Sequence, residues 1–275
     1  MALLIRHFLK WRVLLKKSYE RCRFDLVDPG KVWSHLLEVK SRRGAGYLTL
    51  LDPDRLSIQE LELRADQCIE AGADAILIGS SLMLSSRYSE CFKRIKARTS
   101  LPVICFPGST SQVTPAADAI LFLSMISGRN PELLIGQHVR AAPLIKEYEI
   151  EPIATGYILV ESGEYTSVEF MSHTRPLPRN KTDIAMAHAL AAEYLGMKAI
   201  YLETGSGSNQ SVPLAMISDV ANYVSLPIIV GGGIRDDILA RKVVEAGASF
   251  VVTGSLVEDN SERLAQLSSA IHFKD

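Results

Sequence analysis

From residue 47 onward, short runs of β-branched and other apolar residues alternate with segments whose apolar positions recur at helical spacing. The apolar runs are nearly continuous, which indicates strands that are buried on both faces. Parallel sheets that are covered by helices contain strands of this kind. We therefore expect eight strands, at Tyr47–Leu51, Ala75–Ile78, Val103–Phe106, Ala119–Leu123, Ala154–Val160, Ala199–Glu203, Pro227–Gly231 and Phe250–Gly254.

Turn and cap residues mark the ends of the helical segments. Ser57 with Glu60 is the signature of a capping box, and Gly72 follows the same segment where a helix should end. Residues 69–80 and 244–255 are identical at six of twelve positions. Each of these two segments runs from a helix end through a glycine turn into a strand that ends in Gly-Ser, which supports repeated βα units.

The number and order of these units favour a barrel. Eight βα units over about 230 residues fit a (β/α)8 TIM barrel, which typically has about 250 residues. A doubly wound open sheet is the alternative, but it normally carries a Gly-rich loop after its first strand. Here the first strand leads into Asp52-Pro53-Asp54. We predict an α/β fold with one (β/α)8 TIM-barrel domain over residues 31–275 and an N-terminal helical extension over 1–30.

The predicted extension is basic and amphipathic. Residues 1–30 contain seven Lys and Arg against three Asp and Glu, although the whole chain has a net charge of -1. A basic amphipathic helix can lie on an anionic membrane surface. The alternatives are a helix packed on the main body and a poorly ordered extension. Arg6 and Lys10 interrupt the apolar stretch, so a signal peptide is not indicated.

Composition narrows the class of protein. The chain has 275 residues, of which 47% are hydrophobic and 22% charged, as in ordinary globular proteins. The balanced charge gives no footprint for nucleic acid, and no apolar run approaches the ~20 residues that span a bilayer. We expect a soluble cytoplasmic protein with reduced thiols, because no C-x-x-C pair occurs among its cysteines. These are Cys22, Cys68, Cys91 and Cys105.

Glycine-rich turns follow the last three predicted strands. They cover residues 204–208, 231–235 and 254–255. Glycine lets backbone N–H groups approach a phosphate, and phosphate sites in barrels recur after strands seven and eight. We therefore predict a phosphate site at these turns. No Walker-type Lys-Ser/Thr follows the glycines, which argues against a nucleoside triphosphate.

Asp52 follows the first predicted strand, at the end where barrel enzymes carry their chemistry. Its carboxylate can bind a hard cation or form the turn, and both interpretations stay open. Mg²⁺ takes one or two protein carboxylates or hydroxyls and lets substrate phosphates complete its shell, so Asp52 with Ser81 would suit it. Asp54 is expected to be the turn and cap residue.

Other chemistries lack their residues. No lysine stands at a strand exit, which argues against Schiff-base aldolase chemistry, and the six histidines show no metal-ligand spacing. The segment Glu161–Lys181 is long and contains Arg175, Arg179 and Lys181. It is either a lid whose basic side chains meet a diphosphate or a solvated basic loop.

The strand exits together resemble those of geranylgeranylglyceryl phosphate synthases, barrel prenyltransferases that include the bacterial heptaprenylglyceryl phosphate synthases. The order and spacing match over roughly residues 47–260. Ser80 and Ser255 stand where Gly and Asn are usual, and Leu50 replaces a basic residue of short bacterial relatives. The motifs that carry the resemblance are Leu50–Asp54, Ile78–Ser81, Tyr201–Gly207, Gly231–Arg235 and Gly254-Ser255.

The resemblance implies Mg²⁺-dependent transfer of a geranylgeranyl group from its diphosphate to the C3 hydroxyl of sn-glycerol 1-phosphate, in ether-type membrane lipid synthesis by a homo-oligomer. It implies that Asp52 and Ser81 hold the metal and that Glu203 orients the hydroxyl and takes its proton. The residues implied to bind glycerol phosphate are Tyr201, Leu202, Glu203, Thr204, Gly205, Ser206, Gly207, Gly232, Gly233, Gly254 and Ser255.

Two other functions stay open. A phosphosugar isomerase of the histidine-biosynthesis barrel type would use Asp52 and Glu161 as acid and base, without metal or lipid. A non-catalytic phosphoglycerol-binding or membrane-surface module would use the glycine turns and the basic extension without turnover. Prenyl chain length, the number of subunits and the role of the basic loop are not fixed by the sequence.

Overall fold

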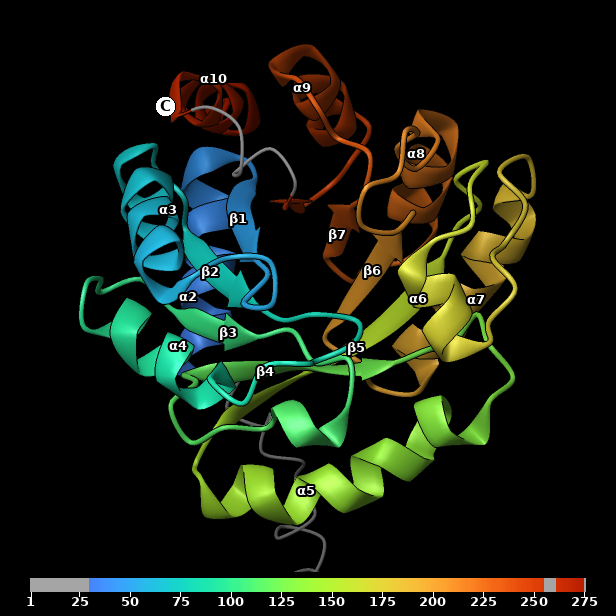
Figure 1. Ribbon diagram of the computed structural model, residues 1–275. Coiled ribbons are helices and arrows are strands. Elements are labelled where there is room, and N and C mark those ends of the chain that lie inside the picture. The colour runs from blue at the N-terminus through green and yellow to red at the C-terminus, as the bar shows by residue number, and fades with distance from the viewer. Residues whose placement is uncertain (1–29, 255–260, 275) are drawn as a thin grey trace, which may run out of the picture.

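A computed structural model describes residues 30–254 and 261–274 of the chain (Figure 1). Eight parallel strands pair in chain order, and β8 pairs with β1, so the sheet closes into a barrel with helices outside it. The (β/α)8 fold predicted from the sequence is thereby confirmed. The predicted extension, apart from Gly30, and the site residue Ser255 lie outside the described residues.

The predicted strands are all present, and several helical features were missed. The strands are β1 (Gly46–Leu51), β2 (Ala75–Ile78), β3 (Val103–Cys105), β4 (Ala119–Ser124), β5 (Glu151–Leu159), β6 (Ala199–Glu203), β7 (Ile228–Gly231) and β8 (Phe250–Thr253). The helices are α2 (Lys31–Arg43), α3 (Ile58–Glu70), α4 (Tyr88–Lys96), α5 (Gln137–Glu147), α6 (Ser167–Ser172), α7 (Thr182–Tyr194), α8 (Leu214–Tyr223), α9 (Asp237–Glu245) and α10 (Ser261–Ile271), with short turns η1 (Thr110–Gln112) and η2 (Glu132–Gly136). Among the missed features are α2, the π-helical turn η2, and α6, which lies in the segment Glu161–Lys181 that the sequence presented as a lid or a loop.

Local signals set the element ends as expected. Ser57 Oγ accepts from Glu60 N at 3.2 Å and Glu60 Oε2 accepts from Ser57 N at 2.8 Å, which completes the capping box of α3. β5 starts earlier than predicted, at Glu151, and therefore includes Pro152. The proline is tolerated because β6 pairs with β5 only from Thr155 onward, so no neighbour needs its missing N–H.

Two apolar layers hold the barrel together. Alternate strand residues point inward and outward, so Tyr201 belongs to the cluster inside the barrel while Leu202 packs between the strands and the helices. α2 contributes Trp33 to the inner cluster, where the Trp33 ring lies 5.8 Å from the ring of Phe250. α2 therefore closes the amino-terminal end of the barrel and leaves the carboxyl-terminal end open.

A buried carboxylate joins distant segments at this closed end. Asp74 accepts hydrogen bonds from Tyr47 N at 2.7 Å, His272 Nε2 at 2.8 Å and Arg43 Nη1 at 2.9 Å. These partners belong to β1, to the residues after α10 and to α2. One side chain thus connects the first described helix, the first strand and the end of the chain.

The cysteines of the described residues are buried. Cys68, Cys91 and Cys105 are buried and free, and burial raises the pKa of Cys68 to about 11 and that of Cys105 to about 12. Such thiols are poor nucleophiles. In the described part of the chain, no helix combines the length and the apolar character that crossing a membrane requires.

The amino end of α2 rests on one carboxylate of β5. Glu151 accepts from Val32 N at 2.7 Å and from Trp33 N at 2.9 Å, which neutralises unpaired N–H groups at the positive end of the helix dipole. Gly30 has φ +87°, and a Cβ there would lie 2.0 Å from the Glu151 carboxyl carbon. The glycine therefore lets the carboxylate approach.

We predict that Glu151→Ala lowers the free energy of unfolding by about 1–2 kcal/mol, because the α2 N–H groups lose their acceptor. Urea unfolding measures the change. Glu147→Ala is the control, since Glu147 is exposed near the end of α5. An equal, small effect of both substitutions would contradict the capping role.

Candidate active site

A cavity of about 1080 Å³ lies at the carboxyl ends of the strands. Most residues singled out from the sequence line it, although they come from five different strand exits. They are Asp52, Ser81, Tyr201, Glu203, Gly205, Ser206, Gly207, Gly232, Gly233 and Gly254. The barrel geometry therefore gathers these residues around one space.

Two residues of the implied acceptor site do not line this cavity. Leu202 points outward into the layer between strands and helices, because its neighbours Tyr201 and Glu203 point inward and strand residues alternate. Thr204 is buried beside Glu203 without lining the cavity wall. The period of two along the strand was the signal that identifies the outward position of Leu202.

Glu203 ends β6 as a buried carboxylate. Only 5% of it is exposed, and Oε1 accepts from Gly205 N at 2.6 Å. Burial raises the pKa of Glu203 to about 7, although the Gly205 N–H and the nearby Tyr201 hydroxyl pull it down. A carboxylate with this pKa can accept and release a proton near neutral pH.

Glycines of β7 make room for this group. A Cβ at Gly231 would lie 2.4 Å from the Tyr201 hydroxyl and 2.8 Å from Glu203 Oε2. A Cβ at Gly232, where φ is +83°, would lie 2.3 Å from Thr204 Oγ1 and 2.4 Å from Glu203 Oε1. The glycines at this strand exit are therefore required by the volume of the polar side chains from β6.

Unpaired hydroxyls surround the same carboxylate. The Tyr201 hydroxyl and Thr204 Oγ1 are buried and have no hydrogen-bond partner among the described residues. An unsatisfied buried polar group costs about 1–3 kcal/mol. Tyr201 lines the cavity beside Glu203, which favours a ligand that brings hydroxyl groups of its own to this end, whereas Thr204 does not line it.

The glycine loops, which we define as residues 204–208, 231–235 and 254, line the same cavity as Glu203. Arg235 Nη2 donates to the carbonyls of Gly207 at 3.3 Å and Ser208 at 3.1 Å, so it fixes one loop against the next. The sequence analysis gave Arg235 no role. The sequence signal for such a role was the position of Arg235 directly after the Gly-Gly-Gly-Ile turn.

Asp52 forms the turn after β1 with one oxygen and faces cations with the other. Its Oδ1 accepts from Asp54 N at 3.0 Å, and Arg55 Nε lies 3.4 Å from Oδ2. Burial raises the pKa of Asp52, while hydrogen bonds from the Asp54 backbone and the Ser80 hydroxyl and the Arg55 charge lower it. The turn-forming interpretation is confirmed, and metal binding stays a prediction.

Asp54 holds a neighbouring loop. Its carboxylate accepts from Leu84 N at 2.9 Å and from Ser85 N at 2.8 Å. This loop carries Ser81 along the cavity wall. The expectation that Asp54 forms the turn after β1 is therefore wrong, since Asp52 accepts within that turn and the Asp54 carboxylate holds the loop after β2.

The exit residues of β1 and β2 fit Mg²⁺. No group of three His, Cys, Asp or Glu side chains that could hold a metal exists within the described residues. Mg²⁺ does not need one, because it keeps waters and binds substrate phosphates alongside one or two protein oxygens. Asp52 and Ser81 line the same cavity and offer one carboxylate and one hydroxyl, which are oxygen ligands of the kind that Mg²⁺ takes.

The rest of the cavity wall is largely apolar. Its residues come from β4, η2, α5 and α6, and include Leu121, Phe122, Leu123, Met125, Leu133, Ala141, Val168 and Met171. The sequence analysis missed this wall, because apolar residues that line a cavity have the same spacing as residues that pack in a core. The cavity therefore joins a polar end to an apolar end.

The segment Glu161–Lys181 reaches the cavity through α6, but its basic side chains do not. Arg175, Arg179 and Lys181 are absent from its wall, and Arg179 donates to the carbonyls of Glu161 at 2.9 Å and Ser211 at 2.8 Å. The basic residues that line the cavity are Arg55, Arg235 and Arg263.

The acid–base pair of the isomerase alternative is not assembled. Glu161 is exposed and does not line the cavity that holds Asp52.

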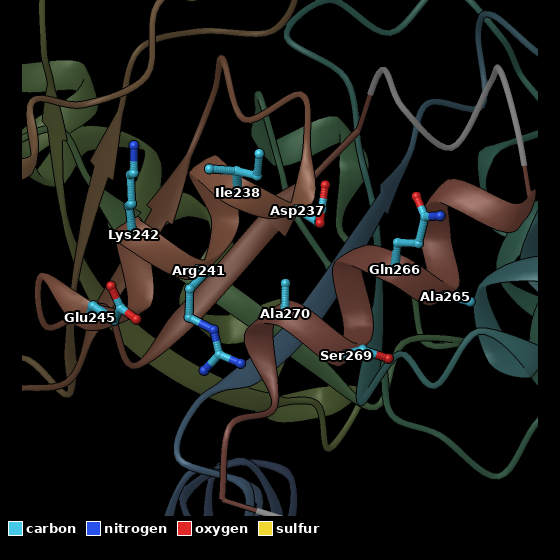
Figure 2. A pocket seen from close by; sticks show the side chains of 9 residues that line it. All are labelled: Asp237, Ile238, Arg241, Lys242, Glu245, Ala265, Gln266, Ser269 and Ala270. Atoms are coloured by element: carbon cyan, nitrogen blue, oxygen red, sulfur yellow. The ribbon is translucent and has the colours of Figure 1, made fainter.

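A second hollow of about 670 Å³ lies on the outside of the barrel between α9 and α10 (Figure 2). Asp237, Arg241 and Glu245 from α9 face Gln266 and Ser269 from α10 across it. No strand-exit residue contributes to this hollow. The chemistry predicted from the sequence therefore belongs to the cavity at the strand ends.

The chain is similar to a well-defined set of proteins. The PcrB family matches residues 37–271. Geranylgeranylglyceryl phosphate synthase of Chitinophaga pinensis is 43% identical over 242 residues, which cover 88% of this chain and 96% of the relative. The protein of the same name from Methanosphaera stadtmanae is 42% identical over 229 residues, covering 82% and 93%.

A solved structure agrees with the fold and with the relatives. The crystal structure of (S)-3-O-geranylgeranylglyceryl phosphate synthase from Thermoplasma acidophilum in complex with sn-glycerol-1-phosphate has a TM-score of 0.83 and 34% identity. The match covers 88% of this chain and 98% of that one.

We predict that Glu203 makes stability fall as pH rises. Its folded-state pKa of about 7 exceeds its ordinary value of 4.5, so the folded chain holds the proton more tightly. The stabilisation is complete below about pH 4.5 and is lost as pH rises through about 7. The free energy of unfolding should therefore fall between pH 5 and pH 8, and Glu203→Gln should make this fall smaller by about 2 kcal/mol.

Urea unfolding at the two pH values measures this difference. Glu161→Gln serves as the control because its carboxylate is exposed. Parallel pH profiles for the unsubstituted protein and Glu203→Gln would show that Glu203 titrates normally.

Proposed function

The chain belongs to the PcrB family and is a prenyltransferase, and we propose that it transfers the geranylgeranyl group of geranylgeranyl diphosphate to the C3 hydroxyl of sn-glycerol 1-phosphate. One observation carries the proposal. A single cavity places the buried Glu203 and the unpaired Tyr201 hydroxyl at one end and an apolar wall at the other, with Asp52 at its rim. This arrangement suits a small polyol phosphate and a long hydrocarbon chain held together.

The acceptor belongs at the polar end. The glycine loops bring the backbone close to the cavity at Gly205, Gly207, Gly232 and Gly233, where a phosphate can be held without side-chain obstruction. Arg235 lines the same region and adds positive charge. Glu203 and Tyr201 then lie where the glycerol hydroxyls of a bound acceptor extend.

The donor belongs along the apolar wall with its diphosphate toward Asp52. Ser81 and Asp52 would hold Mg²⁺, which when bound neutralises the charge that develops on the departing diphosphate. Arg55 lies at the same rim and can contact a phosphate oxygen. The apolar residues of β4 and α5 exclude water from the reacting carbon.

Glu203 is the base in this proposal. The C3 hydroxyl donates its proton to the carboxylate as its oxygen attacks C1 of the prenyl group and the C1–O bond to diphosphate breaks. A pKa of about 7 leaves a substantial fraction of Glu203 ionised at neutral pH. The Gly205 N–H fixes the orientation of the carboxylate, so no reorganisation is needed when the proton moves.

The wider setting follows from this chemistry. The product is a precursor of ether-type membrane lipids, and we expect the enzyme to work in the cytoplasm as a homo-oligomer with peripheral membrane contact. The observed cavity gives no support to the isomerase alternative, since Glu161 is outside it. A binding module without turnover would not need the buried carboxylate of Glu203 in the cavity.

Incubation of the full chain with radiolabelled sn-glycerol 1-phosphate, a panel of prenyl diphosphates and Mg²⁺ tests the proposal. We expect an alkali-stable ether product with geranylgeranyl diphosphate and none after chelation of Mg²⁺. Binding of glycerol phosphate without any ether product would favour the non-catalytic module. Metal-independent isomerisation of a phosphosugar would overturn the proposal.

We predict that Gly232→Ala raises the KM for glycerol phosphate by about 10-fold or more, because its Cβ would collide with Glu203 and Thr204. The matched control is Gly196→Ala. Gly196 also has positive φ, +75°, but a Cβ there meets nothing within 4 Å. Both variants place alanine at a positive φ, but only Gly232→Ala also brings a Cβ into contact with Glu203 and Thr204. A difference between their steady-state kinetics therefore reports the effect of that contact. Equal kinetics for both would remove Gly232 from the acceptor site.

We predict that Asp52→Asn lowers kcat by about 10²-fold and raises the Mg²⁺ concentration needed for half-maximal rate. Asparagine keeps the shape and an Oδ1 acceptor for the Asp54 N–H, so the turn survives. A magnesium titration of the initial rate is the measurement. Near-native activity at ordinary Mg²⁺ would leave Asp52 with its turn-forming role alone.

A further inference from the structure

Three aromatic rings form part of the cavity wall. Phe106 and Tyr201 are stacked, with ring centroids 5.4 Å apart and an angle of 15° between the planes. Tyr157 lies 5.2 Å from Tyr201 and 6.3 Å from Phe106. Tyr157 and Tyr201 are almost fully buried, whereas Phe106 is partly exposed and lines the cavity. The Phe106 ring is therefore the exposed member of the cluster, with the two tyrosines behind it.

Phe106 is packed against the exit of β2 on one side. Its N–H donates to the carbonyl of Ile78 at 2.9 Å, and a Cβ at Gly79 would lie only 1.8 Å from its carbonyl oxygen. Ser80 and Ser81 follow directly on this glycine. The Phe106 backbone therefore lies beside the exit of β2, the part of the cavity where Ser81 would help to hold the diphosphate.

On its other side Phe106 contacts Tyr201, which is a neighbour of the proposed base Glu203. It stacks on Tyr201, whose hydroxyl lies beside the Glu203 carboxylate and lowers its pKa. Phe106 consequently lies between the exit that carries Ser81 and the strand that carries Glu203. In the proposed reaction, C1 of the prenyl group leaves the diphosphate near Ser81 and bonds to the acceptor oxygen near Glu203. It therefore moves through the space beside Phe106.

The cluster is electron-rich without being nucleophilic. Burial, with the charge of Glu203, raises the pKa of Tyr157 and of Tyr201 well above the ordinary value, so both phenols stay protonated. A protonated phenol is a much weaker nucleophile toward a carbon cation than a phenolate is. The face of an aromatic ring nevertheless attracts a cation that lies within about 6 Å of its centre, and the attraction grows when water is excluded.

We propose that the exposed face of Phe106 stabilises the allylic cation that develops during prenyl transfer, an inference that rests on the proposed function. The C1–O bond to the diphosphate breaks and the electron pair leaves with the diphosphate. Positive charge then spreads over C1 and C3 of the prenyl chain, above the ring. The acceptor oxygen forms the new bond to C1, and its proton passes to Glu203.

The competing interpretation is that Phe106 only fills space in the cavity wall. Fluorination of the ring distinguishes the two roles, because fluorine withdraws electron density from the ring face while changing its size very little. A packing role responds to size, whereas a cation-stabilising role responds to the ring electrons. The test is therefore a graded series of mono-, di- and trifluorophenylalanine at position 106 of the full chain.

We expect kcat with geranylgeranyl diphosphate and sn-glycerol 1-phosphate to fall stepwise, by roughly 10- to 30-fold across the series. The KM values for both substrates should stay within about 2-fold. The same series at Phe250 is the control. Phe250 also contacts an aromatic ring inside the barrel, but it lies against Trp33 at the closed end and does not line the cavity. Its fluorination should leave kcat unchanged.

A binding measurement supplies a readout that does not need turnover. A geranylgeranyl ammonium ion with inorganic diphosphate mimics the cation pair, and geranylgeraniol with diphosphate is its neutral counterpart. Calorimetry should show affinity for the ammonium ion falling with each fluorine at Phe106, with no trend for the alcohol.

The outcomes separate the two proposals. A flat kcat series in a protein that transfers the prenyl group overturns the role of Phe106 and leaves the proposed function standing. Equal trends for the ammonium ion and the alcohol also overturn it, since they indicate packing. Failure of the unsubstituted protein to form the ether overturns the proposed function and the role of Phe106 with it.

Discussion

The burial of one carboxylate constrains the whole open end of the barrel. Glu203 can end β6 inside the barrel only because Gly231 and Gly232 of the next strand carry no side chains. The same two glycines leave room for the Tyr201 and Thr204 hydroxyls, of which Tyr201 belongs to the cavity wall. A desolvated carboxylate and unpaired hydroxyls each cost free energy of folding, so this end of the barrel is locally destabilised.

The polar and apolar ends of the cavity depend on different parts of the fold. Strand exits supply the polar end, and their positions follow from barrel register. η2, α5 and α6 supply much of the apolar end, and these are segments between strands, which a barrel can vary in length and path without changing its sheet. The polar end of the cavity is thus tied to the sheet, and the shape of its apolar end to the segments between strands.

Much of this arrangement could be predicted from the sequence, for physical reasons. Eight apolar runs identified all eight strands, because strands buried on both faces admit few polar residues. Glycines and carboxylates directly after those runs identified the polar end. The apolar wall and the closure by α2 were not predictable, since Leu133, Ala141 or Trp33 has the same spacing whether it lines a cavity, plugs a barrel or packs in a core. Leu202 shows that alternation along a strand must be applied residue by residue.

The closure of the barrel also sets the order in which the chain can become native during synthesis. β1 finds its second neighbour only in β8, and Asp74 receives one of its hydrogen bonds from His272 near the end of the chain. At about 5–20 residues per second, a ribosome needs roughly 10 to 40 s to proceed from β1 to β8. Throughout that interval one edge of β1 is an open template for other strands. The barrel of a nascent chain therefore stays open until β8 has been made.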